Sequence, residues 1–196
     1  MIAIIDSGGA NIASVKFALE RLGVGSVLTD DVDVICSADK VILPGVGAAP
    51  AAMQRLASTG LIDCIRTLQQ PVLGICLGMQ LLFSHSAEGD TALLGLFDAT
   101  CTAFTPNSRL SVPHIGWNQL VFQQEHPLLA GVNTGAHVYF VHSYFAPVTT
   151  QTIATCWYGH DFTAIAGEKN FMGCQFHPER SGSVGTRILQ NFLEMP

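Results

Sequence analysis

A cysteine stands between two glycines at the end of a short apolar run, and this spacing can expose a nucleophile. Residues 72–75 lead into Cys76, with Gly74 two residues before it and Gly78 two residues after it. Such spacing is typical of a nucleophile elbow, in which a sharp strand-to-helix turn projects a reactive side chain. A cysteine that only fills the core, which is the common alternative, does not need flanking glycines. We therefore predict that Cys76 is a nucleophile.

A base and a carboxylate follow a second apolar run near the end of the chain. His177 and Glu179 are separated only by Pro178. If the two strand ends meet in space, His177 is the general base for Cys76 and Glu179 orients the imidazole. Taken alone, the histidine and the glutamate are explained equally well by a strand that turns into a loop. The combination predicts a thiol enzyme that attacks an acyl carbon.

Two further features fit such a reaction. The run Pro44-Gly45-Val46-Gly47 follows the apolar residues 41–43, and its glycines allow backbone N–H groups to turn toward a developing oxyanion. An ordinary tight turn is an equally good reading of this run by itself. Gln80 lies four residues after Cys76, on the same face of the predicted helix, where its amide can bind a polar substrate.

Composition limits the classes of function. Of 196 residues, 48% are apolar and 12% are charged, with a formal net charge of −6. The excess of apolar residues predicts a protein partner, whereas the acidic balance and the lack of a basic run argue against nucleic-acid binding. The first residues lack the basic segment of a secretory signal, and nothing approaches the roughly 18 apolar residues of a transmembrane helix. We predict a cytoplasmic protein that binds neither nucleic acid nor a membrane.

Six cysteines and seven histidines are spread through the chain. They form no C-x-x-C pair and no spacing typical of a metal site. We predict free thiols in a reducing compartment, with no metal and no other cofactor.

The first half of the chain alternates apolar runs with amphipathic segments. Strands are predicted at 2–5, 41–43 and 72–75, and helices from an Asn11 cap to Gly23, at 51–56 and at 61–68. Continuous apolar strands separated by helices indicate a buried parallel sheet that is covered on both faces. Ligands of such sheets lie beyond the carboxyl ends of the strands, where Cys76, the 44–47 loop and His177 would meet.

The second half has closely spaced strands and a final helix. Strands are predicted at 94–97, 119–122, 138–141, 153–157, 162–166 and 171–176, and a helix at 184–194. Close spacing suits antiparallel additions to the sheet. We predict one α/β domain over residues 1–196, with a mixed, mainly parallel central sheet, helices on both faces and added antiparallel strands.

The chain resembles the class I (triad-type) glutamine amidotransferases along its whole length, which implies their flavodoxin-like fold. The cysteine elbow and the His-Pro-Glu run are shared by the class. Other runs resemble, more narrowly, the glutaminase subunits of imidazole glycerol phosphate synthases. These are Asp6-Ser7-Gly8-Gly9-Ala10-Asn11, Pro44-Gly45-Val46-Gly47, Pro113-His114-Ile115-Gly116-Trp117-Asn118 and Tyr139-Phe140-Val141-His142-Ser143-Tyr144.

The resemblance implies a role for each group of residues. Cys76 attacks the side-chain amide of glutamine, His177 held by Glu179 moves the protons, and water hydrolyses the thioester to glutamate. The implied oxyanion donors are the N–H groups of Gly47 and Leu77, with the peptide of Val46 controlling their formation. The implied glutamine pocket comprises Gln80, Ser143 and Tyr144.

The resemblance also implies a partner. Ammonia would pass to a (β/α)8-barrel cyclase subunit, in a heterodimer that makes imidazole glycerol phosphate and aminoimidazole carboxamide ribotide in histidine biosynthesis. Trp117, Asn118 and Tyr139 would face that subunit, although Trp117 could instead pack in the core. Two alternatives stay open: a subunit of another synthase, such as anthranilate or guanylate synthesis, and a non-catalytic module or peptidase on the same scaffold.

Overall fold

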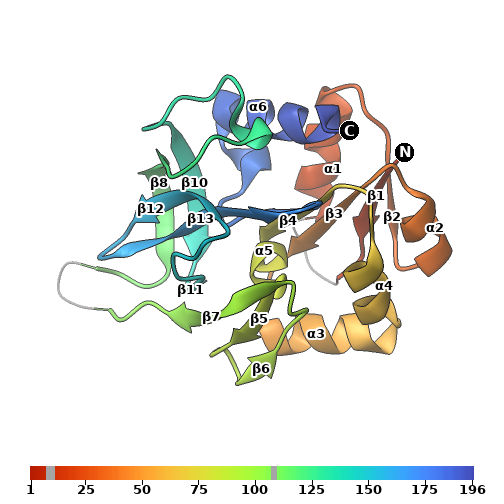
Figure 1. The fold of residues 1–196 in the computed structure, drawn as a ribbon, viewed down its shortest axis with the longest axis horizontal. Coiled ribbons are helices and arrows are strands. Elements are labelled where there is room, and N and C mark those ends of the chain that lie inside the picture. Colours follow the sequence, from red (N-terminus) through yellow and green to blue (C-terminus); the bar gives the residue numbers. More distant parts are fainter. Residues whose placement is uncertain (8–11, 107–109) are drawn as a thin grey trace.

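The computed structural model describes residues 1–7, 12–106 and 110–196, and its centre is an eight-stranded sheet (Figure 1). The strands of this sheet are β1 (Ile2–Ile5), β2 (Ser26–Thr29), β3 (Lys40–Gly45), β4 (Val72–Cys76), β9 (Val121–Phe122), β12 (Thr152–Trp157), β13 (Asp161–Glu168) and β14 (Phe171–Cys174). Their order is β2-β1-β3-β4-β14-β13-β12-β9. The strands from β2 to β14 run parallel, and β13, β12 and β9 join antiparallel. The predicted mixed sheet is confirmed.

Two smaller sheets lie beside the central one. Their strands are β5 (Phe83–Ser86), β6 (Thr91–Ala92), β7 (Phe97–Ala103) and β11 (Tyr144–Phe145) in one sheet, and β8 (His114–Gln119) and β10 (His137–His142) in the other. The segment 138–141 was predicted as an addition to the central sheet, but β10 pairs with β8 instead. The predicted strand 119–122 is interrupted at Leu120, whose N–H donates to the carbonyl of Ala136 at 2.9 Å.

The prediction of a strand at residues 94–97 is wrong. Strand β7 begins only at Phe97. The residues before it turn back on the chain that follows Cys76, because the N–H of Leu94 donates to the carbonyl of Leu81 at 3.0 Å. An apolar run therefore marks burial here rather than a strand.

Helices cover both faces of the central sheet, as predicted (Figure 1). They are α1 (Ile12–Arg21), α2 (Val32–Ser37), α3 (Ala49–Ser58), α4 (Leu61–Thr67), α5 (Leu77–Leu81) and α6 (Gly182–Glu194). The buried apolar side chains of α1 and α6 share one core with those of β10. Those of α2, α3 and α4 share the other core with the four-stranded sheet. The predicted cap at Asn11 lies outside the described residues.

The sequence pattern explains the two layers. Strands β1, β3 and β4 are buried along their whole length, as expected of parallel strands that are covered on both faces. Helix α1 buries Val15, Ala18 and Leu19, which lie on one face. The edge strand β2 is partly exposed along its length, and it was not predicted because its pattern is not continuously apolar.

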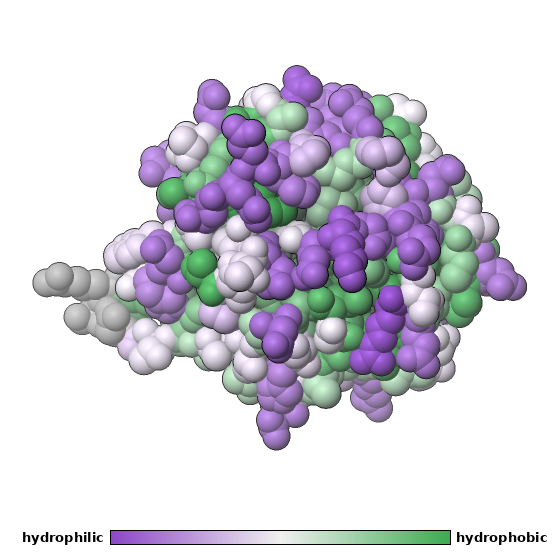
Figure 2. Space-filling model, in the orientation of Figure 1, coloured by the Kyte–Doolittle hydropathy of each residue, from purple (hydrophilic) through white to green (hydrophobic). Residues whose placement is uncertain are grey.

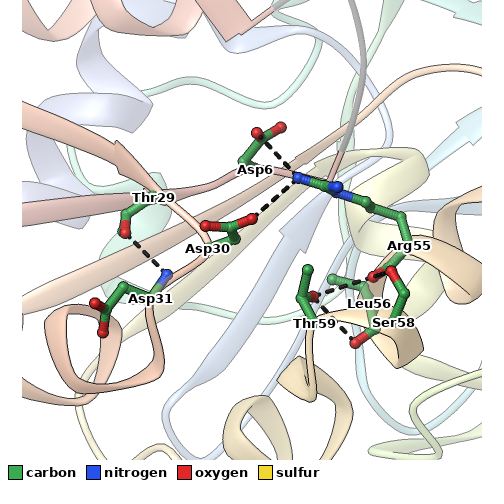
Figure 3. A network of polar contacts seen from close by, with 8 residues as sticks. All are labelled: Asp6, Thr29, Asp30, Asp31, Arg55, Leu56, Ser58 and Thr59. Atoms are coloured by element: carbon green, nitrogen blue, oxygen red, sulfur yellow. Dashed lines mark hydrogen bonds and ion pairs between the residues drawn. The ribbon is translucent and has the colours of Figure 1, made fainter.

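An ionic network joins the carboxyl ends of β1 and β2 to helix α3 (Figure 3). The Arg55 guanidinium lies 3.5 Å from the carboxylate of Asp6 and 3.0 Å from that of Asp30. These side chains are partly exposed, so each pair stabilises the fold by less than about 1 kcal/mol. The Ser7 hydroxyl, which follows Asp6, donates to the carbonyl of Pro44 at 2.7 Å. The network therefore lies next to the glycine-rich loop.

Apolar side chains are exposed between polar ones on the face shown in Figure 2. Among the large exposed apolar residues are Ile115, Trp117 and Trp157, whose exposed fractions are 60%, 56% and 62%. Trp117 is thus not a core residue. In the described parts of the chain, no helix is long and apolar enough to span a membrane.

Glycines allow α5 to pack directly on β3 and β4. A Cβ atom added at Gly78 would lie 1.8 Å from the carbonyl oxygen of Leu43, and one added at Gly74 would lie 2.6 Å from the carbonyl oxygen of Gly78. Both contacts are with backbone, which cannot move aside as a side chain can. The glycines that flank Cys76 are therefore required for close packing.

Replacing Gly78 with alanine should lower the free energy of unfolding by about 3 kcal/mol, because the added methyl group overlaps the Leu43 carbonyl. Urea unfolding of the purified variant measures this change. Gly25→Ala is the matched control, because a Cβ atom there meets nothing within 4 Å. Equal stability of the two variants would contradict the close packing.

Candidate active site

Cys76 lies at the turn from β4 into α5, as predicted. Its φ and ψ angles are 56° and −113°, a conformation that costs a non-glycine residue on the order of 1–3 kcal/mol and is concentrated at functional sites. Helix α5 is short and ends at Leu81. The turn directs the Cys76 sulfur toward β10, where it lies 3.8 Å from the carbonyl oxygen of Val141.

The neighbouring strands bring the other predicted groups to Cys76. In the β3–β4 register Gly45 lies opposite Cys76, so the residues that follow Gly45 emerge beside the cysteine. In the β14–β4 register Cys174 lies opposite Ile75, so the chain leaves β14 at the same edge, toward His177. Parallel pairing thus brings together segments that are far apart in the sequence.

His177 and Glu179 form a buried pair. The Nδ1–H of His177 donates to the Oε1 of Glu179 at 2.8 Å, and the exposed fractions of the two side chains are 4% and 0%. The residues Pro178–Arg180 form a short 3-10 helix. The N–H of His177 donates to the carbonyl of Tyr139 at 3.0 Å, and the Ser181 hydroxyl donates to the carbonyl of His177 at 2.7 Å. The backbone of the base is therefore fixed to β10.

The charge of His177 depends on two acidic neighbours. Burial lowers the pKa of the imidazole, but a hydrogen bond to Cys76 and another to Glu179, with the negative charges of both groups, raise that pKa to about 10. A histidine held between a thiolate and a carboxylate favours the imidazolium form. The arrangement can hold the thiol proton and later deliver it to a leaving group.

One cavity of about 330 Å³ contains the predicted site, a volume that suits a small ligand. Its lining includes every residue predicted for the reaction except Glu179. The lining residues with predicted roles are Cys76, His177, Val46, Gly47, Leu77, Gln80, Ser143 and Tyr144. Gly47 has a φ of 94°, which side chains rarely allow, so the conformation of this loop depends on glycine.

Gln80 makes contacts that its spacing did not predict. Its Nε2 donates to the carbonyl of Tyr144 at 2.8 Å and to the Oε1 of Gln175 at 2.9 Å. The Nε2 of Gln175 lies 3.9 Å from the Cys76 sulfur. A substrate that binds the Gln80 amide nitrogen must therefore compete with protein acceptors.

Sequence reasoning missed several residues at the cavity. Gln175 is fully buried beside Cys76, and the available signal was a polar residue in an apolar run two positions before the base. Glu88 also lines the cavity, and its Oε2 accepts from the N–H of Ala49 at 2.7 Å. No local pattern distinguished Glu88. His142 also lines the cavity and is buried.

The residues predicted to face a partner lie on the β8–β10 pair. Trp117 and Tyr139 are opposite each other, with ring centroids 6.0 Å apart. Asn118 is tied to the protein instead: its Nδ2 donates to the carbonyl of Trp157 at 2.9 Å and lies 3.3 Å from the Nε2 of His114. The structure therefore exposes Trp117 but uses the Asn118 amide internally.

A larger cavity, of about 510 Å³, lies at the amino ends of β4 and β14. Its lining includes His126, Lys169 and Glu194 but no cysteine. Of these two cavities, the smaller one is lined by the residues predicted for the reaction.

Comparisons with known proteins show the family to which the chain belongs. The family described as glutamine amidotransferase class-I matches residues 3–195. Two relatives described as imidazole glycerol phosphate synthase subunit HisH are similar across the chain. That of Xanthomonas euvesicatoria pv. vesicatoria is 55% identical and that of Xylella fastidiosa 54% identical, and both matches cover 99% of this chain and 97% of the relative.

Two solved structures share the fold. One, described as a glutamine amidotransferase, has a TM-score of 0.75 at 18% identity, with 98% of this chain and 97% of that chain covered. The other, the glutaminase domain of Trypanosoma brucei CTPS with bound acivicin, has a TM-score of 0.69 at 13% identity, with 100% and 94% covered. At these identities the likeness concerns the fold alone.

His114 and His142 should each make a contribution to stability that is lost in mild acid. Burial lowers the pKa of His114 from 6.5 to about 4. Burial also lowers the pKa of His142, to about 3, although its hydrogen bond to the Tyr144 backbone acts in the opposite direction and raises the pKa. Between pH 6.5 and these values the unfolded chain binds more protons, so stability is complete above pH 6.5 and falls as the pH falls through this window. The pair should contribute roughly 3 kcal/mol of loss by about pH 5.5, about 1.4 kcal/mol for each histidine.

Urea unfolding at two pH values measures this loss. The double variant His114→Gln with His142→Gln should show a smaller difference in unfolding free energy between pH 7.5 and about pH 5.5, because it lacks both titrating groups. His137→Gln, which changes an exposed histidine, serves as the control. An unchanged pH dependence in the double variant would contradict the assignment.

Proposed function

Because the chain belongs to the class I glutamine amidotransferases, we propose that it is the glutaminase subunit of an imidazole glycerol phosphate synthase. The observation that carries this proposal is that Cys76 and His177 line one cavity and Glu179 is hydrogen-bonded to His177, in a chain 55% identical to a HisH subunit over 99% of its length. That identity favours this synthase over anthranilate or guanylate synthesis. Residues 1–196 then form one glutamine amidotransferase domain.

The first half of the reaction forms a thioester. The Cys76 thiolate attacks the side-chain carbonyl carbon of glutamine, and His177 holds the thiol proton. The carbonyl oxygen becomes an oxyanion, stabilised by the N–H groups of Gly47 and Leu77, with the Val46 peptide setting the loop geometry. The carbon–nitrogen bond then breaks, and His177 gives its proton to the departing ammonia.

The second half restores the enzyme. His177 takes a proton from water, the resulting hydroxide attacks the thioester carbon, and the carbon–sulfur bond breaks to give glutamate and the Cys76 thiolate. Glu179 accepts a hydrogen bond from the imidazolium and stabilises its charge in both halves. Its 2.8 Å contact with Nδ1 of His177 supports this role.

The remaining cavity residues bind glutamine in this proposal. Gln80, Ser143 and Tyr144 border the cavity beside Cys76. Because the Gln80 amide nitrogen contacts Tyr144 and Gln175, it holds the pocket wall in shape as well as facing the substrate. The hydrolysis needs no metal or other cofactor.

Ammonia passes to a (β/α)8-barrel cyclase subunit in a cytoplasmic heterodimer. That subunit forms imidazole glycerol phosphate and aminoimidazole carboxamide ribotide in histidine biosynthesis. The proposed contact surface comprises Trp117, Asn118 and Tyr139, and the exposure of Trp117, at 56%, supports it. A non-catalytic module would not need the strained Cys76 turn or the buried His177–Glu179 pair.

Changing Cys76 to alanine should abolish glutamine hydrolysis by the complex, with a loss of about 10⁵-fold or more, because the nucleophile and base act as one unit. Glu179→Gln should cost roughly 10-fold to 100-fold less, since an orienting group contributes less than the reacting groups. Glutamate release in the presence of the nucleotide-bound cyclase subunit measures both.

Cys36→Ala is the matched control, because Cys36 is an exposed thiol on α2. It should keep the parent rate. Glutamate formation above background by the folded Cys76→Ala complex would show that another residue is the nucleophile.

Ammonia should bypass the loss of Cys76, because all of the thiol chemistry lies on this chain and the ring chemistry on the partner. The Cys76→Ala complex should be inactive with glutamine but should make imidazole glycerol phosphate from ammonium salt at alkaline pH. The measurement is the product formed with each nitrogen source. An associated complex that stays inactive with excess ammonia would refute this division of labour.

A further inference from the structure

Two buried histidines outside the triad face each other across the β8–β10 pair. His114 and His142 are opposite in register, and the Nδ1 of His114 lies 3.1 Å from the Nε2 of His142. The His114 ring is stacked between Tyr158 and Phe140, with centroid distances of 3.9 Å and 4.9 Å. A polar ring in such surroundings is costly unless its nitrogens are hydrogen-bonded.

The protons of the two rings can be assigned from their partners. The Nδ1 of His142 lies 2.8 Å from the carbonyl oxygen of Tyr144, which can only accept, so this nitrogen carries the proton. The Nε2 of a neutral His142 must then accept, and the Nδ1 of His114 donates to it. The Nε2 of His114 accepts in turn from the amide of Asn118, 3.3 Å away. Each of the four ring nitrogens therefore acts either as a donor or as an acceptor, and none has to do both.

The chain of hydrogen bonds continues to the nucleophile. The Tyr144 carbonyl that accepts from His142 also accepts from the Nε2 of Gln80, at 2.8 Å. The same Gln80 nitrogen donates to Gln175, whose own amide nitrogen lies 3.9 Å from the Cys76 sulfur. Tyr144 is therefore the shared acceptor between the histidine pair and the glutamines beside Cys76.

We propose that His114 and His142 are positioning residues for glutamine hydrolysis, because their hydrogen bonds hold the Tyr144 carbonyl and, through Gln80 and Gln175, the wall of the cavity beside Cys76. This inference rests on the proposed function. His142 holds one of the two lone pairs of the Tyr144 carbonyl. Without that bond the Tyr144 peptide can rotate, and the Gln80 amide follows its acceptor.

The decisive comparison is between two replacements of His142 in the complex with a saturating, nucleotide-bound cyclase subunit. His142→Phe keeps a flat ring but loses both nitrogens, and kcat/KM for glutamine should fall about 100-fold, with KM raised and kcat lowered. His142→Gln keeps one donor and one acceptor, and its kcat/KM for glutamine should be at least about tenfold higher than that of His142→Phe. A role in filling space alone predicts the opposite order.

A chemical readout separates the pocket from the thiol. Labelling of Cys76 by a glutamine-mimicking electrophile should slow in His142→Phe in parallel with kcat/KM, whereas labelling by iodoacetamide, which needs no glutamine pocket, should change by less than about threefold. His137→Phe, which alters an exposed histidine on the same strand, is the matched control and should keep both labelling rates.

Asn118→Asp provides a second test if His142→Phe does not fold. The aspartate keeps the shape of the side chain but places an acceptor against the Nε2 of His114, so a neutral His114 must shift its proton and lose donation to His142. We expect a loss of about tenfold in kcat/KM when the cyclase subunit is saturating.

The outcomes are distinct. The positioning role is overturned if folded His142→Phe has the kinetics and labelling rates of the parent while the parent complex hydrolyses glutamine. If His142→Phe does not fold, the same result in Asn118→Asp overturns it. A parent complex that releases no glutamate would overturn the proposed function and this inference together.

Discussion

The contact between α5 and strand β3 is the constraint on which the site depends. Gly78 lies so close to the Leu43 carbonyl that a side chain cannot be accommodated. The same contact sets the point where Cys76 leaves β4 and where the 44–47 loop leaves β3, because Gly45 lies opposite Cys76 in the strand register. One backbone contact thus places the proposed nucleophile and the proposed oxyanion donors relative to each other. The strained φ of Cys76 follows from this geometry and is tolerated because the surrounding packing determines it.

The pKa values of the histidines near the cavity are shifted in opposite directions. His177 lies between the thiol of Cys76 and the carboxylate of Glu179, and the pKa of its imidazole is raised to about 10 despite burial. His142 is buried, its ring nitrogens contact His114 and the Tyr144 carbonyl, and its pKa is lowered to about 3. The first environment suits proton transfer, and the second suits a hydrogen bond of fixed direction. Neighbouring groups rather than residue type decide which histidine can act as a base.

The antiparallel pair β8–β10 supports the site as well as extending the β-structure. Strand β10 anchors the backbone of His177 through Tyr139 and borders the Cys76 sulfur at Val141. Its partner β8 exposes Trp117 beside Tyr139. The surface proposed to meet the cyclase subunit therefore belongs to the same strand pair that supports the proposed base. A partner that binds the proposed surface would contact the strand pair of which β10 borders the cavity.

The sequence by itself determined the local chemistry of this protein. Glycine spacing around Cys76 and the short His177–Glu179 spacing restrict the backbone within a few residues, so a turn with a nucleophile and a base beside a carboxylate could be predicted, as could the parallel strands that carry them. Only the tertiary structure decided which groups meet across long separations. Gln80 and Gln175 bond to each other although 95 residues separate them, β10 pairs with β8 rather than with the central sheet, and Asn118 turns its amide inward. Side-chain hydrogen bonds leave no periodic pattern in a sequence, because their geometry depends on how whole strands are packed.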